Sequence, residues 1–170
     1  MLMRHAKSDW NSAALDDFSR PLNSRGRRDA RAIGKWMLNS GYVPDVILSS
    51  PSARTRETVS RLGKGLGMDF TLRTSWFEEL YHASAQQIVH VLQRHGTGVL
   101  SMVVAHNPGL EMALDWLTDP ENRPSEHRKT FPTAACYVLE ARLDAGKIAG
   151  GNAQIRCHMR PKLLNTAMPD

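Results

Sequence analysis

The chain has 170 residues, of which 41% are hydrophobic and 23% are charged, and its formal net charge is +5. This composition is typical of a soluble globular protein and disfavours a disordered chain, a collagen or a disulfide-rich peptide. The sequence contains no apolar run near the roughly 20 residues of a membrane helix. The basic excess favours an anionic partner but does not choose among nucleic acid, a membrane surface and a phosphorylated substrate.

The start of the sequence shows no apolar segment of the kind found in a signal peptide, and the chain has two cysteines, Cys136 and Cys157. We therefore expect a cytoplasmic protein with free thiols. No repeat, low-complexity tract or linker divides the sequence, so a single domain over residues 1–170 is predicted. A chain of this length can bury about two-thirds of its unfolded surface, which is enough for a core without disulfides or metals.

The first half of the chain alternates short apolar runs with stretches of helical periodicity. Residues 1–4 indicate the end of a strand, and 6–24 are polar and irregular. A helix is expected at about 25–40, where Ala30, Ile33 and Met37 share one face. The elements predicted next are a buried strand at 45–48, a helix at 52–66 ended by glycines, a short strand near 68–72 and a loop at 74–83.

The second half continues the same alternation. Ser84 can cap a helix at about 85–95, and the apolar run from Val99 to Ala105 predicts a strand covered on both faces. Pro108 fits the first turn of a helix that continues to about residue 118. A polar loop at 119–131 and two closing strands complete the chain. Strands separated by helices predict a three-layer α/β/α sandwich with a mostly parallel sheet.

Chemically active side chains follow three of the predicted strands. In open α/β sheets, ligands bind beyond the carboxyl ends of the strands. Arg4 and His5 follow the first strand, and Arg54 comes shortly after the second, behind two serines. His106 and Asn107 follow the apolar strand. Two arginines and two histidines are therefore expected at one edge of the sheet.

This set of side chains suits a phosphoryl group. Arginine forks match phosphate oxygens, and a neutral imidazole can attack phosphorus and carry a covalent intermediate. The sequence has no His-Glu-x-x-His or Cys-x-x-Cys spacing and no GxxxxGK[ST] phosphate loop. We therefore predict phosphoryl transfer through histidine, without a metal or another cofactor.

Three motifs in order resemble the histidine phosphatase superfamily, also called phosphoglycerate mutase-like. They are Leu2-Met3-Arg4-His5, Ser49-Ser50-Pro51-Ser52-Ala53-Arg54-Thr55-Arg56-Glu57-Thr58 and Val104-Ala105-His106-Asn107. The branch that the chain resembles is that of the SixA-type phosphohistidine phosphatases, through Ala6-Lys7-Ser8-x-Trp10 after the first motif and Arg20-Pro21-Leu22 followed by Arg25-Gly26. Members usually have glycine where this chain has Ala6.

The resemblance implies a role for each matching residue. His5 would be the nucleophile, while Arg4, Arg54 and His106 would bind and stabilise the phosphoryl group. Arg20 would add a contact from the loop over the site, and Asn107 would also bind phosphate. Many members use a glutamate after the third strand as general acid; Glu79 stands near that position, although the SixA-type branch is thought to require no acid.

The expected substrate is a phosphohistidine on a partner protein or a small phosphorylated metabolite. A phosphomonoesterase with Glu79 as acid and a phospho-ligand binding module without turnover are the alternatives. Nucleic-acid binding would use a basic cluster on the first helix, which we expect to be a solvated face instead. The cluster comprises Arg25, Arg27, Arg28 and Arg31. Neither nucleic acid nor a membrane is predicted as a partner.

Overall fold

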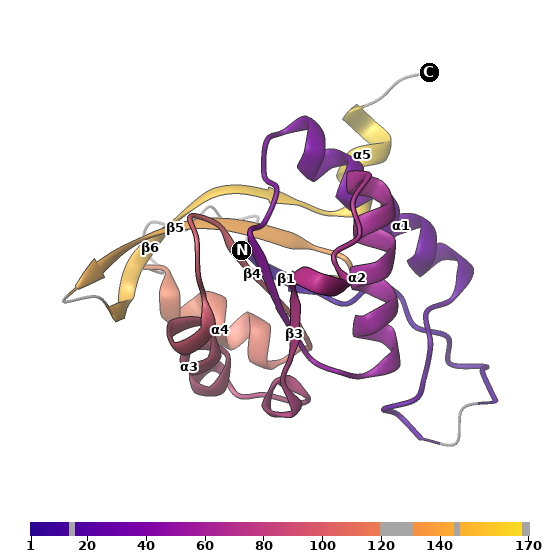
Figure 1. The fold of residues 1–170 in the computed structure, drawn as a ribbon, viewed down its shortest axis with the longest axis horizontal. Helices are drawn as coiled ribbons and strands as arrows, with labels where there is room; N and C mark the ends of the chain where they lie inside the picture. Colours follow the sequence, from indigo (N-terminus) through magenta and orange to yellow (C-terminus); the bar gives the residue numbers. More distant parts are fainter. Residues whose placement is uncertain (14–15, 120–130, 145–146, 168–170) are drawn as a thin grey trace.

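The computed structural model describes residues 1–13, 16–119, 131–144 and 147–167. At its centre lies a six-stranded sheet with the strand order β3-β2-β4-β1-β5-β6 (Figure 1). The strands are β1 (Leu2–Arg4), β2 (Val46–Ser49), β3 (Thr74–Trp76), β4 (Ser101–Ala105), β5 (Cys136–Asp144) and β6 (Lys147–Met159).

The sheet is parallel from β3 to β1, whereas β5 and β6 form an antiparallel hairpin at one side. Arg4 is in register with Ala105, and Ser49 is in register with Val104. The carboxyl ends of β1, β2 and β4 therefore lie side by side. The residues that follow these strands must emerge at one edge of the sheet, as the sequence predicted.

Helices cover both faces of the sheet, which confirms the predicted three-layer sandwich. In Figure 1, α1 (Ser24–Asn39) and α2 (Ala53–Leu66) lie on one side of the sheet, and α3 (Ala85–His95) and α4 (Gly109–Leu117) lie on the other. The short α5 (Pro161–Ala167) packs against α1. Among the described helices, none is long and apolar enough to cross a bilayer.

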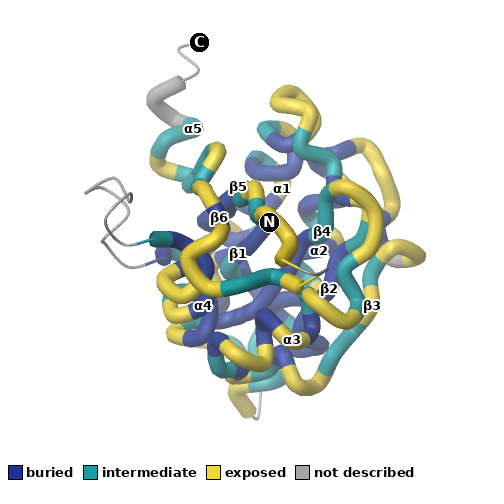
Figure 2. The backbone as a smooth tube through the Cα atoms, turned by 90° about the vertical axis from the view of Figure 1, so that its left-hand side faces the viewer, coloured by how far each residue is buried: buried dark blue, intermediate teal, exposed yellow. Residues whose placement is uncertain are grey.

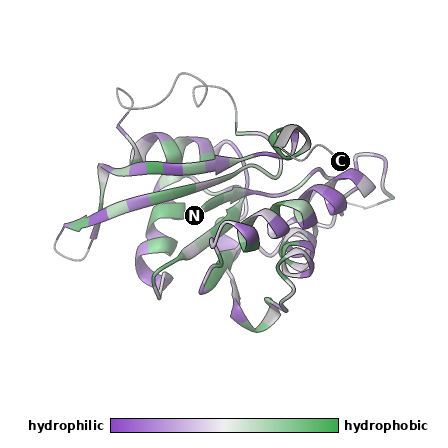
Figure 3. Ribbon diagram, turned by 90° about the horizontal axis from the view of Figure 1, so that it is seen from above, coloured by the Kyte–Doolittle hydropathy of each residue, from purple (hydrophilic) through white to green (hydrophobic). Residues whose placement is uncertain are grey.

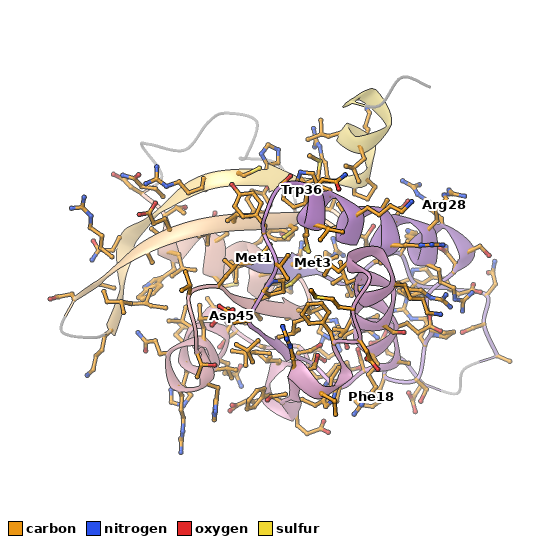
Figure 4. The ribbon with its side chains drawn as sticks, turned by 45° about the horizontal axis from the view of Figure 1, so that its top comes forward. Met1, Met3, Phe18, Arg28, Trp36 and Asp45 are labelled. Carbon is orange, nitrogen blue, oxygen red and sulfur yellow. The ribbon has the colours of Figure 1, made fainter. Side chains whose placement is uncertain are left out.

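The central strands are buried on both faces because their side chains alternate between two cores. Met3 and Val104 pack with α1 and α2, while Leu2 and Val103 pack with α3 and α4. Figure 2 shows these strands in the dark blue of buried residues, and Figure 4 places Met1 and Met3 near the middle of the molecule. An apolar run thus specifies a central strand even where, as in β1, it is only three residues long.

The β5–β6 hairpin extends beyond the rest of the sheet. Hydrophilic and hydrophobic residues alternate along it in Figure 3, because one of its faces is exposed to water. Cys136 is buried on β5 and Cys157 is half-buried on β6, and both are free thiols. The register pairs Cys157 with Val138 rather than with Cys136, so the two thiols are not cross-strand partners.

The predicted helices are confirmed to within about two residues, but one strand was predicted wrongly. The stretch near 68–72 leads into a 3-10 turn, η1 (Thr71–Arg73), and the strand is β3 (Thr74–Trp76), within the predicted loop. This edge strand is short and only partly buried, so no apolar run marks it.

The strand predicted from Val99 to Ala105 begins two residues later than expected, because Val99 is 99% exposed and β4 starts at Ser101. Most of the loop predicted at 119–131 lies outside the described residues.

Two glycines allow α1 and α2 to pack closely. A Cβ atom on Gly65 would lie 2.2 Å from the carbonyl oxygen of Arg31, and a Cβ atom on Gly34 would lie 2.3 Å from the carbonyl oxygen of Leu62.

The sequence suggested that the glycines at 63, 65 and 67 end the helix. Only Gly67 does so, with a φ of 70°, whereas Gly63 and Gly65 lie within α2.

Replacing Gly65 by alanine tests this packing. Helix propensity alone predicts that Gly65→Ala stabilises the protein by about 1 kcal/mol. The clash with the α1 backbone predicts instead a loss of about 1–3 kcal/mol in the free energy of unfolding, measured by denaturant titration. Lys64→Ala, at the neighbouring exposed position, is the matched control and should not destabilise the protein. A more stable Gly65→Ala protein would contradict the close contact.

Candidate active site

The two predicted histidines meet at the carboxyl edge of the sheet. Their ring centroids are 5.1 Å apart, and His5 and His106 are 7% and 4% exposed. The backbone N–H of His5 donates to the carbonyl of Ala105, the last residue of β4. Neighbouring strands thus hold the two imidazoles in contact.

A backbone hydrogen bond defines the proton position on His5. Its Nδ1 lies 2.8 Å from the carbonyl oxygen of Ala6. A carbonyl can only accept, so Nδ1 must carry the proton in this bond. In the neutral ring, Nε2 then has a free lone pair. Thr58 supports the turn, since its hydroxyl accepts from the N–H of Ala6 at 3.0 Å.

His106 is held by a serine that follows β2. Its Nε2 lies 2.9 Å from Oγ of Ser50, and its buried Nδ1 has no hydrogen-bond partner among the described residues. Leu110, in the first turn of α4, donates its N–H to the His106 carbonyl. The ring is therefore fixed at Nε2 by a serine hydroxyl while its backbone joins the start of a helix.

Arg54 lies in the first turn of α2 and is only 2% exposed. Its Nη1 donates to the backbone carbonyl of Asp17 at 2.5 Å, and its Nη2 donates to the Asp17 carboxylate at 2.9 Å. A helix N-terminus disfavours a cation, so this position needs an anion nearby. Asp17, from the loop before α1, supplies that anion in the structure.

Arg4 and Asn107 share one backbone acceptor. Arg4 Nη1 donates to the carbonyl of Phe131 at 2.8 Å, and the amide nitrogen of Asn107 donates to the same oxygen at 3.1 Å. The Asn107 amide also donates to Glu111. Because the donors of Asn107 are already used, its phosphate contact stays a prediction.

Burial and positive charge together keep both imidazoles neutral. The pKa of His5 is lowered to about 3, chiefly by burial; the bond to Ala6 raises it, and the charges of Arg54, Arg4 and Arg20 lower it. Burial lowers the pKa of His106 to about 2, assisted by His5 and Arg54. At neutral pH both rings therefore carry lone pairs rather than charges.

Several buried polar atoms at this edge have no hydrogen-bond partner in the described part of the chain. They are Nε of Arg4, Nε of Arg54, Nδ1 of His106 and Oδ1 of Asn107. Buried polar atoms are nearly always hydrogen-bonded, so such a cluster requires an explanation. Two of these atoms are guanidinium donors, which fits a site that takes an oxyanion.

The structure adds residues that sequence analysis did not select. Tyr81 donates its hydroxyl to Asp17 at 2.9 Å, and its ring packs edge-on against His106 with centroids 5.5 Å apart. His82 is exposed, and its Nε2 lies 3.6 Å from the Asp17 carboxylate. The predicted loop residue Arg20 also pairs with Asp17. No local pattern marks the contacts of Tyr81 and His82 with Asp17, because they join segments far apart in sequence.

Glu79 does not join this cluster. It lies on η2 (Glu78–Leu80), a 3-10 turn, and its side chain is exposed. Within the described residues, no hydrogen bond or ion pair connects it to His5, His106 or the arginines. The basic cluster on α1 is also separate from the site: Arg28 lies on the outer side of the helix in Figure 4.

No group of His, Cys, Asp or Glu side chains in the described residues could hold a metal ion. The charge that faces the site comes instead from guanidinium groups. An arrangement of arginines and neutral imidazoles can bind a tetrahedral oxyanion and offer it a nitrogen nucleophile.

Comparison with curated proteins finds relatives along most of the chain. An uncharacterised protein of Mycobacterium tuberculosis is 31% identical over 142 residues, which cover 81% of this chain and 85% of that protein. An uncharacterised chloroplastic protein of Arabidopsis thaliana is 29% identical over 126 residues. The matched part is 69% of this chain but only 58% of the plant protein.

Solved structures share the fold. The SixA protein of Agrobacterium tumefaciens superimposes with a TM-score of 0.78 at 27% identity, covering 94% of this chain and 96% of that one. A protein histidine phosphatase SixA complexed with tungstate gives 0.75 at 23% identity, covering 96% of this chain and 97% of that one.

The model of the histidine phosphatase superfamily (branch 1) matches residues 1–83, which contain His5, Arg54 and the loop between them. This match and the SixA-like structures support phosphatase activity. The chain belongs to the histidine phosphatase superfamily, as a member of the SixA type.

Proposed function

We propose that this chain is a metal-independent phosphohistidine phosphatase that uses His5 as its nucleophile and acts on a phosphohistidine of a partner protein. The observation that carries the proposal is the bond from His5 Nδ1 to the Ala6 carbonyl. It leaves Nε2 unprotonated in a ring that is buried beside two arginines. The likeness to SixA structures supports the choice of substrate.

In the first step, the lone pair of His5 Nε2 attacks phosphorus in line with the substrate's N–P bond. The new Nε2–P bond forms as the substrate's N–P bond breaks, and the departing imidazole takes a proton from solvent. Arg4 and Arg54 neutralise the charge on the phosphoryl oxygens in the transition state. His106 lies close enough to His5 to contact the same oxygens.

In the second step, water hydrolyses the phosphorylated His5. The water oxygen bonds to phosphorus, the Nε2–P bond breaks, and a water proton passes to the released phosphate. The Ala6 carbonyl keeps Nδ1 of His5 protonated, so Nε2 returns as a free lone pair. The enzyme is then ready for another substrate.

The position of Glu79 favours phosphohistidine over an alkyl phosphate as the substrate. An alkoxide is a poor leaving group and needs a general acid, whereas an imidazole departs with less protonation. Glu79 is exposed, and among the residues that the structure describes no hydrogen bond or ion pair joins it to the arginines or histidines of the site. The site is therefore better suited to a labile N–P bond than to a stable ester.

Replacing the nucleophile provides the direct test. His5→Asn should lower the hydrolysis of a phosphohistidine peptide by about 10⁴-fold, because it removes the nitrogen that forms the covalent intermediate. Rapid quenching with ³²P-labelled substrate should trap an acid-labile label on His5 of the wild-type protein. His90→Asn, which changes an exposed histidine of α3, is the matched control and should retain full activity. Full activity of His5→Asn would refute the proposal.

NMR of the histidine side chains tests the protonation state. Because the pKa of His5 is lowered to about 3, its ring should stay neutral, with the proton on Nδ1, from pH 8 down to pH 5. The lowered pKa also means that protonation opposes folding. The free energy of unfolding should thus fall as the pH drops from about 6.5 towards 3. A His5 ring that titrates near pH 6.5, or carries its proton on Nε2, would contradict the structure.

A substrate panel tests the role of Glu79. Glu79→Gln should leave the rate of phosphohistidine hydrolysis within about twofold of wild type. Removal of a true general acid would instead lower the rate by roughly 10²–10⁴-fold. The neighbouring Glu78→Gln serves as the control. A selective loss of alkyl-phosphate hydrolysis in Glu79→Gln would assign Glu79 as the acid and favour the phosphomonoesterase alternative.

A further inference from the structure

The carboxylate of Asp17 is surrounded by donors from separate parts of the chain. Its Oδ2 accepts from Nη2 of Arg54 and from the hydroxyl of Tyr81, each at 2.9 Å. Its Oδ1 accepts from Nη2 of Arg20 at 2.5 Å, and Nε2 of His82 lies 3.6 Å from Oδ2. Two guanidinium groups, a phenol and an imidazole around one carboxylate constitute an anion site. The anion in this site comes from the chain itself.

The two partners of the central ion pair differ in their exposure to solvent. The side chain of Arg54 is 3% exposed, whereas that of Asp17 is 41% exposed. The arginine is therefore the fixed member of the pair, and the carboxylate is the member that an anion from solvent can reach. Arg54 also acts electrostatically on both His5 and His106. The donors that hold Asp17 thus include the arginine proposed to bind the phosphoryl group.

The loop is anchored by the residues that follow Asp17. The carbonyl of Phe18 accepts from the N–H of Ala53 at 3.0 Å, and the Phe18 ring packs edge-on against Tyr81. Arg20 bonds to Ser8, and its guanidinium stacks over the exposed Trp10 ring at 3.6 Å. These contacts keep the loop in place when only the side chain of Asp17 rotates into solvent.

We propose that Asp17 is a specificity-determining residue whose carboxylate occupies the phosphoryl subsite and is exchanged for the phosphoryl group of the substrate. The proposal rests on the proposed function in taking a phosphoryl group as the ligand. A phosphoryl group carries about −1.5 to −2 charges at neutral pH, against −1 for the carboxylate. The dianion therefore displaces Asp17, whereas monoanions compete poorly. When phosphate is released, Asp17 returns to Arg54 and weakens rebinding of the product.

Protonation does not relieve this competition. Partial burial raises the pKa of Asp17, but hydrogen bonds from Arg20 and Tyr81 and the charges of Arg54 and Arg20 outweigh burial and hold the pKa well below its usual range. The carboxylate is thus ionised at neutral pH. Exchange depends on the charge and concentration of the incoming anion.

Calorimetric titration with inorganic phosphate at pH 7 tests the exchange. Asp17→Asn removes the competing charge but keeps the side-chain shape, so it should bind phosphate about tenfold more tightly than wild type. Asp16→Asn makes the same charge change one residue away, at an exposed carboxylate that accepts from Ser19 rather than from an arginine. This control should bind phosphate like wild type. Unchanged or weaker binding by Asp17→Asn would show that Asp17 positions Arg54 for the ligand, and would overturn the proposal.

A structure of the wild-type protein with orthovanadate provides a second measurement that needs no variant. Vanadate should contact Arg54, and Oδ2 of Asp17 should have moved out of hydrogen-bond distance of Nη2. Vanadate bound with the Asp17–Arg54 contact intact would rule out the exchange. Neither experiment depends on turnover, so both can succeed if His5 is not the nucleophile, and both can fail while His5 becomes phosphorylated.

Discussion

The pairing of a buried guanidinium with an anion is the interaction on which the rest of the site depends. A charged group removed from water is costly unless it is paired and hydrogen-bonded. Arg54 is almost completely buried, and it stands at a helix N-terminus, where the backbone dipoles also disfavour a cation. The folded chain offsets both costs with the carboxylate of Asp17. The site therefore has a built-in requirement for negative charge close to Arg54.

The same burial controls the protonation of the histidines. His5 and His106 lie in contact beside cationic groups, and protonation of either ring would add a charge to a desolvated, positively charged edge. Neutral imidazoles are the outcome, and only neutral imidazoles are nucleophilic. An anion close to the two rings would oppose this effect, because negative charge favours the protonated form of an imidazole. The two histidines have different partners, since His5 bonds through Nδ1 to a backbone carbonyl and His106 through Nε2 to a serine hydroxyl.

The sequence predicted those parts of the site that are positioned by the central strands. Apolar runs specify the buried strands β1, β2 and β4, and parallel pairing forces the residues after them to one edge, so Arg4, His5 and His106 could be placed together in advance. Helices with a strong apolar period were also placed correctly. The edge strand β3 was missed because two half-buried residues around an exposed one carry no such pattern. Asp17 was missed because its partners Arg54 and Tyr81 are 37 and 64 residues away, and no local signal encodes that contact.

The turn η2 explains why Tyr81 rather than Glu79 reaches the site. Leu80 is fully buried in the core formed with α3 and α4, and this contact fixes the rotation of the turn. Successive side chains of a 3-10 turn point about 120° apart. With Leu80 inward, Glu79 projects into solvent, and Tyr81 turns towards Asp17 and His106. Bringing Glu79 to the histidines would require Leu80 to leave the core. In the described residues, the packing of Leu80 is thus what separates Glu79 from the cluster of histidines and arginines.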